Sequence, residues 1–220
     1  MQISGISDIR HCFYINLARR LDRRQHAEQQ LRNILLNPNC VQRFHAVENT
    51  ANGAIGCTMS HIRCLMEAKL HGFPHVLICE DDILFTDPLK FRQYFEGCMH
   101  DINTNAGGNW DVIILAGAVR KLQGAIGPHC AQVEACQTTT GYLVNAHYYD
   151  TLIYNFTHGL AQLMANPSQH RHFALDIYWM HLQATDRWFI VMPLSVIQRN
   201  DYSDIEKKQA NYKKCMLTFK

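Results

Sequence analysis

The sequence of 220 residues lacks the features that mark several specialised classes of protein. It has no apolar run near the ~20 residues that a membrane-spanning helix requires. Its net charge of +2 disfavours a nucleic-acid partner, because nucleic-acid-binding proteins concentrate a basic excess on one surface. Residues 1–10 show no basic start followed by an apolar run, so we expect no signal peptide.

The cysteines and histidines do not form a disulfide or zinc framework in the sequence. The 9 cysteines include no Cys-x-x-Cys pair, and Cys12, Cys64 and Cys79 lie in apolar runs, which is typical of buried free thiols. The 13 histidines are scattered without the spacing of a zinc site. We therefore expect a reducing, cytoplasmic compartment.

What the chain does contain is a regular alternation of apolar runs and helical periodicities. Strands are predicted at 11–17, 41–47, 75–79, 110–116, 141–145 and 188–191, helices at 21–36, 57–70, 87–99, 146–164 and 174–184, and turns with short strands over 117–136. This order predicts an α/β fold with a mainly parallel, Rossmann-like sheet and helices on both faces. Without a repeat or a linker, residues 1–220 are predicted to form a single domain, with 1–10 and 206–220 as candidates for flexible ends.

Three consecutive acids, Glu80, Asp81 and Asp82, follow the short apolar run 75–79 directly. Ligands of open α/β sheets bind beyond the carboxyl ends of the strands. Residues two apart in an extended chain point the same way, so Glu80 and Asp82 can converge on one hard cation, Mn²⁺ or Mg²⁺. Such an ion suits a diphosphate leaving group. The acids would also suit a nuclease or a phosphotransferase, and a solvated acidic turn is the simpler alternative.

Three blocks of sequence, in order, narrow this choice. They are Tyr14-Ile-Asn-Leu-Ala-Arg-Arg-Leu-Asp-Arg-Arg24, then Gly53-Ala-Ile-Gly-Cys-Thr-Met-Ser-His61 with Val76-Leu-Ile-Cys-Glu-Asp-Asp-Ile83, then Thr140-Gly-Tyr-Leu-Val144. Together they resemble glycosyltransferase family 25, which includes lipopolysaccharide-type galactosyl- and glucosyltransferases and collagen galactosyltransferases. The resemblance covers about residues 11–200, and the segment 198–205 also resembles members from large DNA viruses and algae.

This resemblance implies a GT-A fold and a metal-dependent, inverting transfer. It also implies a UDP-sugar donor, from which a galactose or glucose moves to a hydroxyl of a glycan or glycoprotein acceptor. A second class of function stays open, namely a non-catalytic sugar-nucleotide or glycan-binding module on the same fold. The sugar, the acceptor and the oligomeric state stay open as well.

Within this resemblance, polar residues after the first strand become candidates for binding the donor. They are Asn16, Arg19, Asp22 and Arg23, because arginine offers forked donors to phosphate and aspartate can bind a ribose or a base edge. Asp81 is expected to contact the ribose or to orient its loop. The alternative is a solvated, arginine-rich start of a helix.

A second group of donor-site candidates is Gly56, Ser60 and His61, expected at a helix N-terminus, which is a natural anion site. A structural role for His61 is equally open. Residues 138–142 are expected to line the donor-sugar or acceptor site, and Trp179 and Trp188 either stack on a sugar or belong to the core.

An inverting transferase needs a base that accepts the proton of the acceptor hydroxyl. Asp176, near the start of an expected helix, is our candidate, with Asp150 and Asp186 as competitors. An ordinary acid at a helix start is the structural alternative. The third metal ligand stays open between Gln198, Asp201 and the diphosphate with water, because no histidine follows residue 181.

Overall fold

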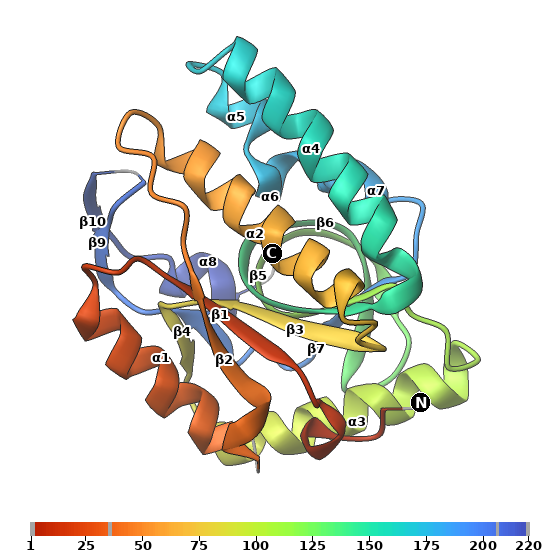
Figure 1. Ribbon diagram of the computed structural model, residues 1–220. Coiled ribbons are helices and arrows are strands. Elements are labelled where there is room, and N and C mark those ends of the chain that lie inside the picture. Colours follow the sequence, from red (N-terminus) through yellow and green to blue (C-terminus); the bar gives the residue numbers. More distant parts are fainter. Residues whose placement is uncertain (1–2, 35–36, 206, 219–220) are drawn as a thin grey trace.

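The computed structural model describes residues 3–34, 37–205 and 207–218, and its centre is a sheet of order β2-β1-β3-β6-β5-β7 (Figure 1). The strands are β1 (Cys12–Asn16), β2 (Val41–His45), β3 (His75–Glu80), β5 (Val112–Ala125), β6 (Cys130–Asn145) and β7 (Trp188–Val191). β1 pairs in parallel with β2 and β3, and β5 pairs in parallel with β7. β6 runs antiparallel to β3, β5 and β7. The sheet is therefore mainly parallel, as predicted.

Side chains of the central strands alternate between two hydrophobic layers, one on each face of the sheet. Phe13 and Ile15 join the layer beneath α2 (Gly53–Leu70) and α4 (Tyr149–Ala165). Cys12 and Tyr14 join the layer beneath α1 (Leu21–Ile34), α3 (Pro88–Asn105) and α8 (Lys213–Leu217). Figure 1 shows α2 and α4 on the side of the sheet opposite to α1 and α3. The predicted α/β class, with helices on both faces of a mainly parallel sheet, is confirmed.

Helix α2 begins earlier than predicted, so Gly56, Ser60 and His61 lie further along the helix than expected. Asn52 caps the helix, and its side chain accepts a hydrogen bond from Ala54 N at 3.1 Å, so α2 begins at Gly53. Ser60 and His61 therefore lie beyond the first turn, and Gly56 N donates to Asn52 O at 3.4 Å. The expected position of Ser60 and His61 at a helix N-terminus was wrong, while their contact with the donor stays a prediction.

The segment 117–136 was predicted as turns and short strands, but it forms the outer half of the long β5–β6 hairpin. Register shifts recur along this pair between Ile114 and Gly124, and such irregularities obscure the alternation that the prediction relied on. The predicted continuous helix over 174–184 is instead two single turns, α6 (Leu175–Tyr178) and α7 (Met180–Gln183).

Smaller elements complete the chain. They are η1 (Ile6–Asp8), η2 (Pro38–Cys40), η3 (Ala146–Tyr148), α5 (His170–Phe173), the pair β4 (Ile83–Phe85) with β8 (Val196–Gln198), and the hairpin β9 (Asp201–Ser203) with β10 (Lys208–Ala210).

The two proposed flexible ends make core contacts. Ile3, Ile6 and Ile9 are buried near the start of the chain, and Met216 of α8 is buried near its end. Residues 1–2, 206 and 219–220 of these ends lie outside the described residues. Within the described ranges, no helix is both long and apolar enough to cross a bilayer.

Candidate functional site

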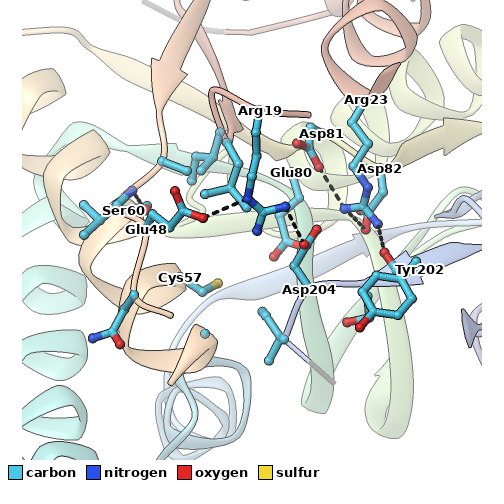
Figure 2. A pocket seen from close by; sticks show the side chains of 18 of the residues that line it. Arg19, Arg23, Glu48, Cys57, Ser60, Glu80, Asp81, Asp82, Tyr202 and Asp204 are labelled. Carbon is cyan, nitrogen blue, oxygen red and sulfur yellow. Dashed lines mark hydrogen bonds and ion pairs between the residues drawn. The ribbon is translucent and has the colours of Figure 1, made fainter. Parts of the chain in front are cut away.

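Two cavities meet at the carboxyl end of β3. The β1 cavity has a volume of about 350 Å³ and lies between the loops after β1 and β2, α2 and the β9–β10 hairpin (Figure 2). The β6 cavity has a volume of about 660 Å³ and lies between α5, α6, α8 and the β5–β6 hairpin. Both are lined by Cys57, Glu80, Gln198, Ser203 and Ile205. They form one cleft with Glu80 at its centre.

The acidic turn does not continue the extended backbone of β3. The strand ends at Glu80, and Asp81 and Asp82 lie in a turn, so the side-chain alternation assumed for Glu80 and Asp82 fails at this point. Instead, Arg23 Nη1 bridges Asp81 Oδ1 at 3.0 Å and Asp82 Oδ2 at 3.2 Å. Figure 2 shows Arg23 reaching down from the start of α1 to these two acids.

Asp82 is the least satisfied acid of the turn. Its Oδ1 is buried and has no hydrogen-bond partner among the described residues. Burial and the nearby charge of Glu80, opposed by Arg23, together raise the pKa of Asp82 to about 8. A divalent ion fits here, because it would give Asp82 Oδ1 a partner and offset the repulsion between the acids. Glu80 and Asp82 are the carboxylates available to hold it.

Glu80 lines both cavities, and each of its oxygens has a hydrogen-bond donor nearby. Thr139 Oγ1 donates to Oε1 at 2.5 Å, and Gln198 Nε2 lies 3.4 Å from Oε2. Burial acts to raise the pKa of Glu80, but His61, Thr139 and Arg23 together hold it below its ordinary value. Glu80 is thus the acid of the turn that stays ionised most readily.

The candidates from the first block divide into two groups. Arg19 and Arg23 line the β1 cavity, where Arg19 also pairs with Glu48 at 2.8 Å and Asp204 at 2.9 Å. Asn16 lies behind the cavity, because its Nδ2 donates to Asp81 Oδ2 at 2.6 Å and its Oδ1 accepts from Arg43.

Asp22 is also outside the lining of both cavities. Its carboxylate is paired with Arg20 at 2.9 Å, and this pairing lowers the pKa of Asp22. Asn16 therefore positions Asp81, and Asp22 organises the basic turn; neither contacts the cleft directly.

Gly56 and Ser60 serve the packing of α2 against the loop after β2. A Cβ at Gly56 would lie 2.4 Å from Val47 O, so only glycine permits this close approach. Ser60 Oγ donates to Gly56 O at 2.7 Å and accepts from Val47 N at 2.8 Å. These residues shape the wall of the β1 cavity.

Asp176 lines the β6 cavity, and Thr138 N donates to its Oδ2 at 3.2 Å. Thr138 has a φ of 73°, which is a strained conformation for a β-branched residue and aims this N–H at the carboxylate. Burial raises the pKa of Asp176, and the charge of Glu80 adds to this. A raised pKa suits a group that has to accept a proton near neutral pH.

The competing candidates lie elsewhere. Asp150 pairs with Lys69 on the surface, and Asp186 accepts a hydrogen bond from Tyr148. Trp179 and Trp188 are buried in the core and pack edge to face on each other, so the core interpretation holds for them.

The structure also places the two candidates for a third metal ligand, Gln198 and Asp201, and residues 138–142. Asp201 is paired with Arg20 at 2.8 Å, whereas Gln198 reaches Glu80. Of residues 138–142, Thr138 and Thr139 line the β6 cavity, and Tyr142 is buried beneath His61.

The sequence interpretation missed Cys57, which lines both cavities. A signal was present, because Cys57 and His61 are four residues apart in a helix and therefore share a face. Glu48 and Asp204 were missed too, and their positions depend on loops far apart in the chain that meet only in the fold.

Comparisons with known proteins point to one family. Residues 36–121 match the sequence model of glycosyltransferase family 25, described as a lipopolysaccharide biosynthesis protein. A probable inactive glycosyltransferase 25 family member 3 from Rattus norvegicus is 31% identical over 125 residues, which are 56% of this chain and 20% of that protein. The corresponding inactive protein from Mus musculus is 30% identical over 125 residues, 56% of this chain and 19% of its own.

The chain thus spans about a fifth of the length of these relatives. Among solved structures, a glycosyltransferase involved in glycosylation of the major capsid of PBCV-1 superposes with a TM-score of 0.49 at 6% identity, over 90% of this chain and 96% of that one. A mannose-1-phosphate geranyltransferase from Thermus thermophilus gives a TM-score of 0.46 at 10% identity, over 89% and 76% of the chains. In sequence, this chain is thus similar to glycosyltransferase family 25 over residues 36–121 and to two of its members over 125 residues.

Proposed function

We propose that this chain transfers a galactose or glucose from a UDP-sugar to a hydroxyl of a glycan or glycoprotein acceptor, with inversion at the anomeric carbon. The observation that carries the proposal is the meeting of two cavities at Glu80, with Asp82 on the β1 side and Asp176 on the β6 side. The match of residues 36–121 to the family 25 model supports glycosyl transfer as the chemistry at this junction.

The β1 cavity is proposed to hold the nucleotide. Arg19 is half exposed at its rim and can offer its guanidinium to a diphosphate, while Arg23 below keeps Asp81 and Asp82 in place. A diphosphate next to the carboxyl groups of Glu80 and Asp82 needs a countercharge. Mn²⁺ or Mg²⁺ bound by Glu80 and Asp82 would neutralise the charge that develops on the leaving diphosphate.

The β6 cavity is proposed to hold the acceptor. Asp176 takes the proton from the acceptor hydroxyl as that oxygen attacks the anomeric carbon, and the Thr138 N–H fixes the direction of the carboxylate. Arg120 and Arg171 lie at the same cavity and favour a polar acceptor over an apolar one. We further propose a reducing compartment such as the cytoplasm, in keeping with nine free thiols.

A release assay tests the proposal. The protein is incubated with UDP-galactose or UDP-glucose and an acceptor panel, once with Mn²⁺, once with Mg²⁺ and once with a chelator, and free UDP is measured. We expect UDP release with one of the two sugars, lost in the chelator. The rat and mouse relatives bear the word inactive in their names, so a sugar-nucleotide-binding module is the second candidate. Donor binding without turnover throughout the panel would favour that module.

A further inference from the structure

A cluster of three different ligand types lies at the junction of the two cavities. One ligand atom each from Cys57, His61 and Glu80 lies within 4.8 Å of the other two. Cys57 and His61 come from neighbouring turns of α2, and Glu80 comes from the end of β3. Cys57 and Glu80 line both cavities, and His61 lines the β1 cavity, so this cluster is open to the cleft.

His61 supplies an independent observation that points to a ligand. Its side chain is 0% exposed, and its Nε2 is buried without a hydrogen-bond partner among the described residues. On the other side of the ring, Nδ1 lies 2.8 Å from the hydroxyl of Tyr142. If this hydroxyl accepts from Nδ1–H, the lone pair of Nε2 faces Glu80, an arrangement that is typical of metal-binding histidines.

The distance between His61 and Glu80 supports the same interpretation. Nε2 lies 3.6 Å from Oε1, which is too long for a hydrogen bond. Two ligand atoms that each bind one tetrahedral zinc ion at about 2.0–2.3 Å are separated by roughly 3.3–3.7 Å. The observed distance therefore fits two ligands of one ion, and small side-chain rotations would bring the sulfur of Cys57 to a similar distance.

We propose that Cys57, His61 and Glu80 form a binding site for a divalent transition-metal ion of the zinc or cobalt type. Thiolate and imidazole ligands favour such ions over Mg²⁺, which prefers oxygen. Binding replaces the S–H bond of Cys57 with a metal–sulfur bond and releases the proton to solvent. The hydrogen bond from Thr139 to Glu80 and the contact between Tyr142 and His61 orient two of the ligands.

Three protein ligands leave a coordination position open toward the cleft, as in catalytic zinc sites. The site adds ligands on the α2 side of Glu80 to the proposed active site. Only a catalytic use of the open coordination position rests on the proposed function. The site itself would form equally in a binding module.

Cobalt titration of the metal-free protein, without donor or acceptor, tests the site. We expect one Co²⁺ per chain, visible absorption of tetrahedral cobalt and a near-ultraviolet band from thiolate-to-cobalt charge transfer. Zn²⁺ should displace the cobalt, and excess Mg²⁺ should not. Cys57→Ser should abolish the charge-transfer band and weaken Co²⁺ binding at least tenfold. The matched control is Cys64→Ser, which removes a buried thiol from the same helix and should keep the band.

A second measurement uses only the wild-type protein, so it does not depend on the folding of a variant. Zn²⁺ should protect Cys57 from alkylation, read by peptide mass spectrometry, while Cys215, a half-buried thiol of the β6 cavity, reacts equally with and without Zn²⁺. Absence of the charge-transfer band, or equal alkylation of Cys57 in both conditions, would overturn the site. A cobalt band without UDP release would support the metal site and contradict sugar transfer. Metal-dependent UDP release without a cobalt band would support sugar transfer and contradict the metal site.

Discussion

Asp111 and Asp82, two acids at opposite ends of the central sheet, differ in how many hydrogen-bond partners their oxygens have. Asp111 lies just before β5, and Asp82 lies just after β3, which runs in the same direction. Asp111 accepts hydrogen bonds from Arg187 N at 2.8 Å and Arg187 Nη2 at 2.6 Å, and lies 2.6 Å from His147 Nε2. Asp82 has one side-chain contact, with Arg23, and a buried oxygen without a partner among the described residues.

The pKa values follow this difference. Burial acts to raise the pKa of Asp111, but the contacts with Arg187 and His147 outweigh it and leave the pKa lowered. Burial and Glu80 raise the pKa of Asp82 to about 8. A buried acid whose oxygens are all satisfied stabilises the fold, whereas one left short of partners is available for a ligand. The difference separates a structural acid, Asp111, from the acid that we propose to be functional, Asp82.

The largest expected effect comes from Asp82→Asn. The change removes a ligand of the metal ion that we propose for the donor site, and we expect UDP release to fall about 10³-fold, because such ions contribute several kcal/mol to transition-state stabilisation. The melting temperature at pH 8 should stay the same or rise. Steady-state release and thermal unfolding measure the two effects, and a variant with wild-type activity would remove Asp82 from the site.

Asp176→Asn tests the acid of the β6 cavity. Loss of the proposed base should lower kcat about 10²- to 10⁴-fold. The affinity for UDP, measured by calorimetry, should stay within about twofold, because Asp176 lies outside the β1 cavity. Asp150→Asn, a surface change, serves as the control and should retain full kcat. An equal loss of UDP affinity and kcat would contradict the assigned role.

Stability should depend on pH through Asp82. Between its ordinary pKa near 4 and its folded value of about 8, the folded state keeps a proton that the unfolded state has lost. The free energy of unfolding of the metal-free protein should therefore decrease by a few kcal/mol from pH 5 to pH 8. Urea unfolding across this range measures it, and Asp82→Asn should flatten the slope. An unchanged slope in the variant would contradict the raised pKa.

Asp111→Asn should affect stability and leave activity alone. The change weakens charged hydrogen bonds to Arg187, whose side chain is half exposed, so we expect a loss of about 2 kcal/mol and a melting temperature lower by about 4–8 °C. UDP release per folded molecule should match the wild type at 20 °C. A variant of normal stability would show that the paired acid is dispensable.

The smallest effect is expected from a change at Arg19, at the rim of the β1 cavity. Arg19→Ala removes pairs with Glu48 and Asp204, but the Arg19 side chain is 51% exposed, so the loss of stability should stay below about 1 kcal/mol. The KM for the UDP-sugar should rise several-fold, because a phosphate contact is lost. Arg19→Lys should recover part of that affinity. An unchanged KM in Arg19→Ala would place the diphosphate elsewhere.

The parts of the fold that sequence could predict were those set by local patterns. The run 188–191 was predicted as a strand and forms β7, and Asp87 caps α3 with Pro88 as its first residue. The acidic turn was located for the same reason, since three charges abruptly follow an apolar run. The β5–β6 hairpin was missed because its register shifts hide the alternation, and α6 and α7 because the helical pattern does not reveal the break at Trp179.

The site was only partly predictable for a different reason. Sequence indicated that Arg23 and His61 matter, but their partners come from distant strands. Arg23 meets Asp81 and Asp82, and His61 meets Glu80 and Tyr142. Which acid keeps an unpaired oxygen depends on these tertiary contacts, and Asp111 and Asp82 look alike until the contacts are known.

The most direct test of the account compares UDP release per folded molecule by the wild type, Asp82→Asn and Asp111→Asn at 20 °C, with Mn²⁺ and with a chelator. The account predicts metal-dependent release by the wild type and by Asp111→Asn at equal rates, and release by Asp82→Asn no greater than by the wild type in chelator. Equal rates for all three proteins, or loss of activity in Asp111→Asn alone, would contradict it.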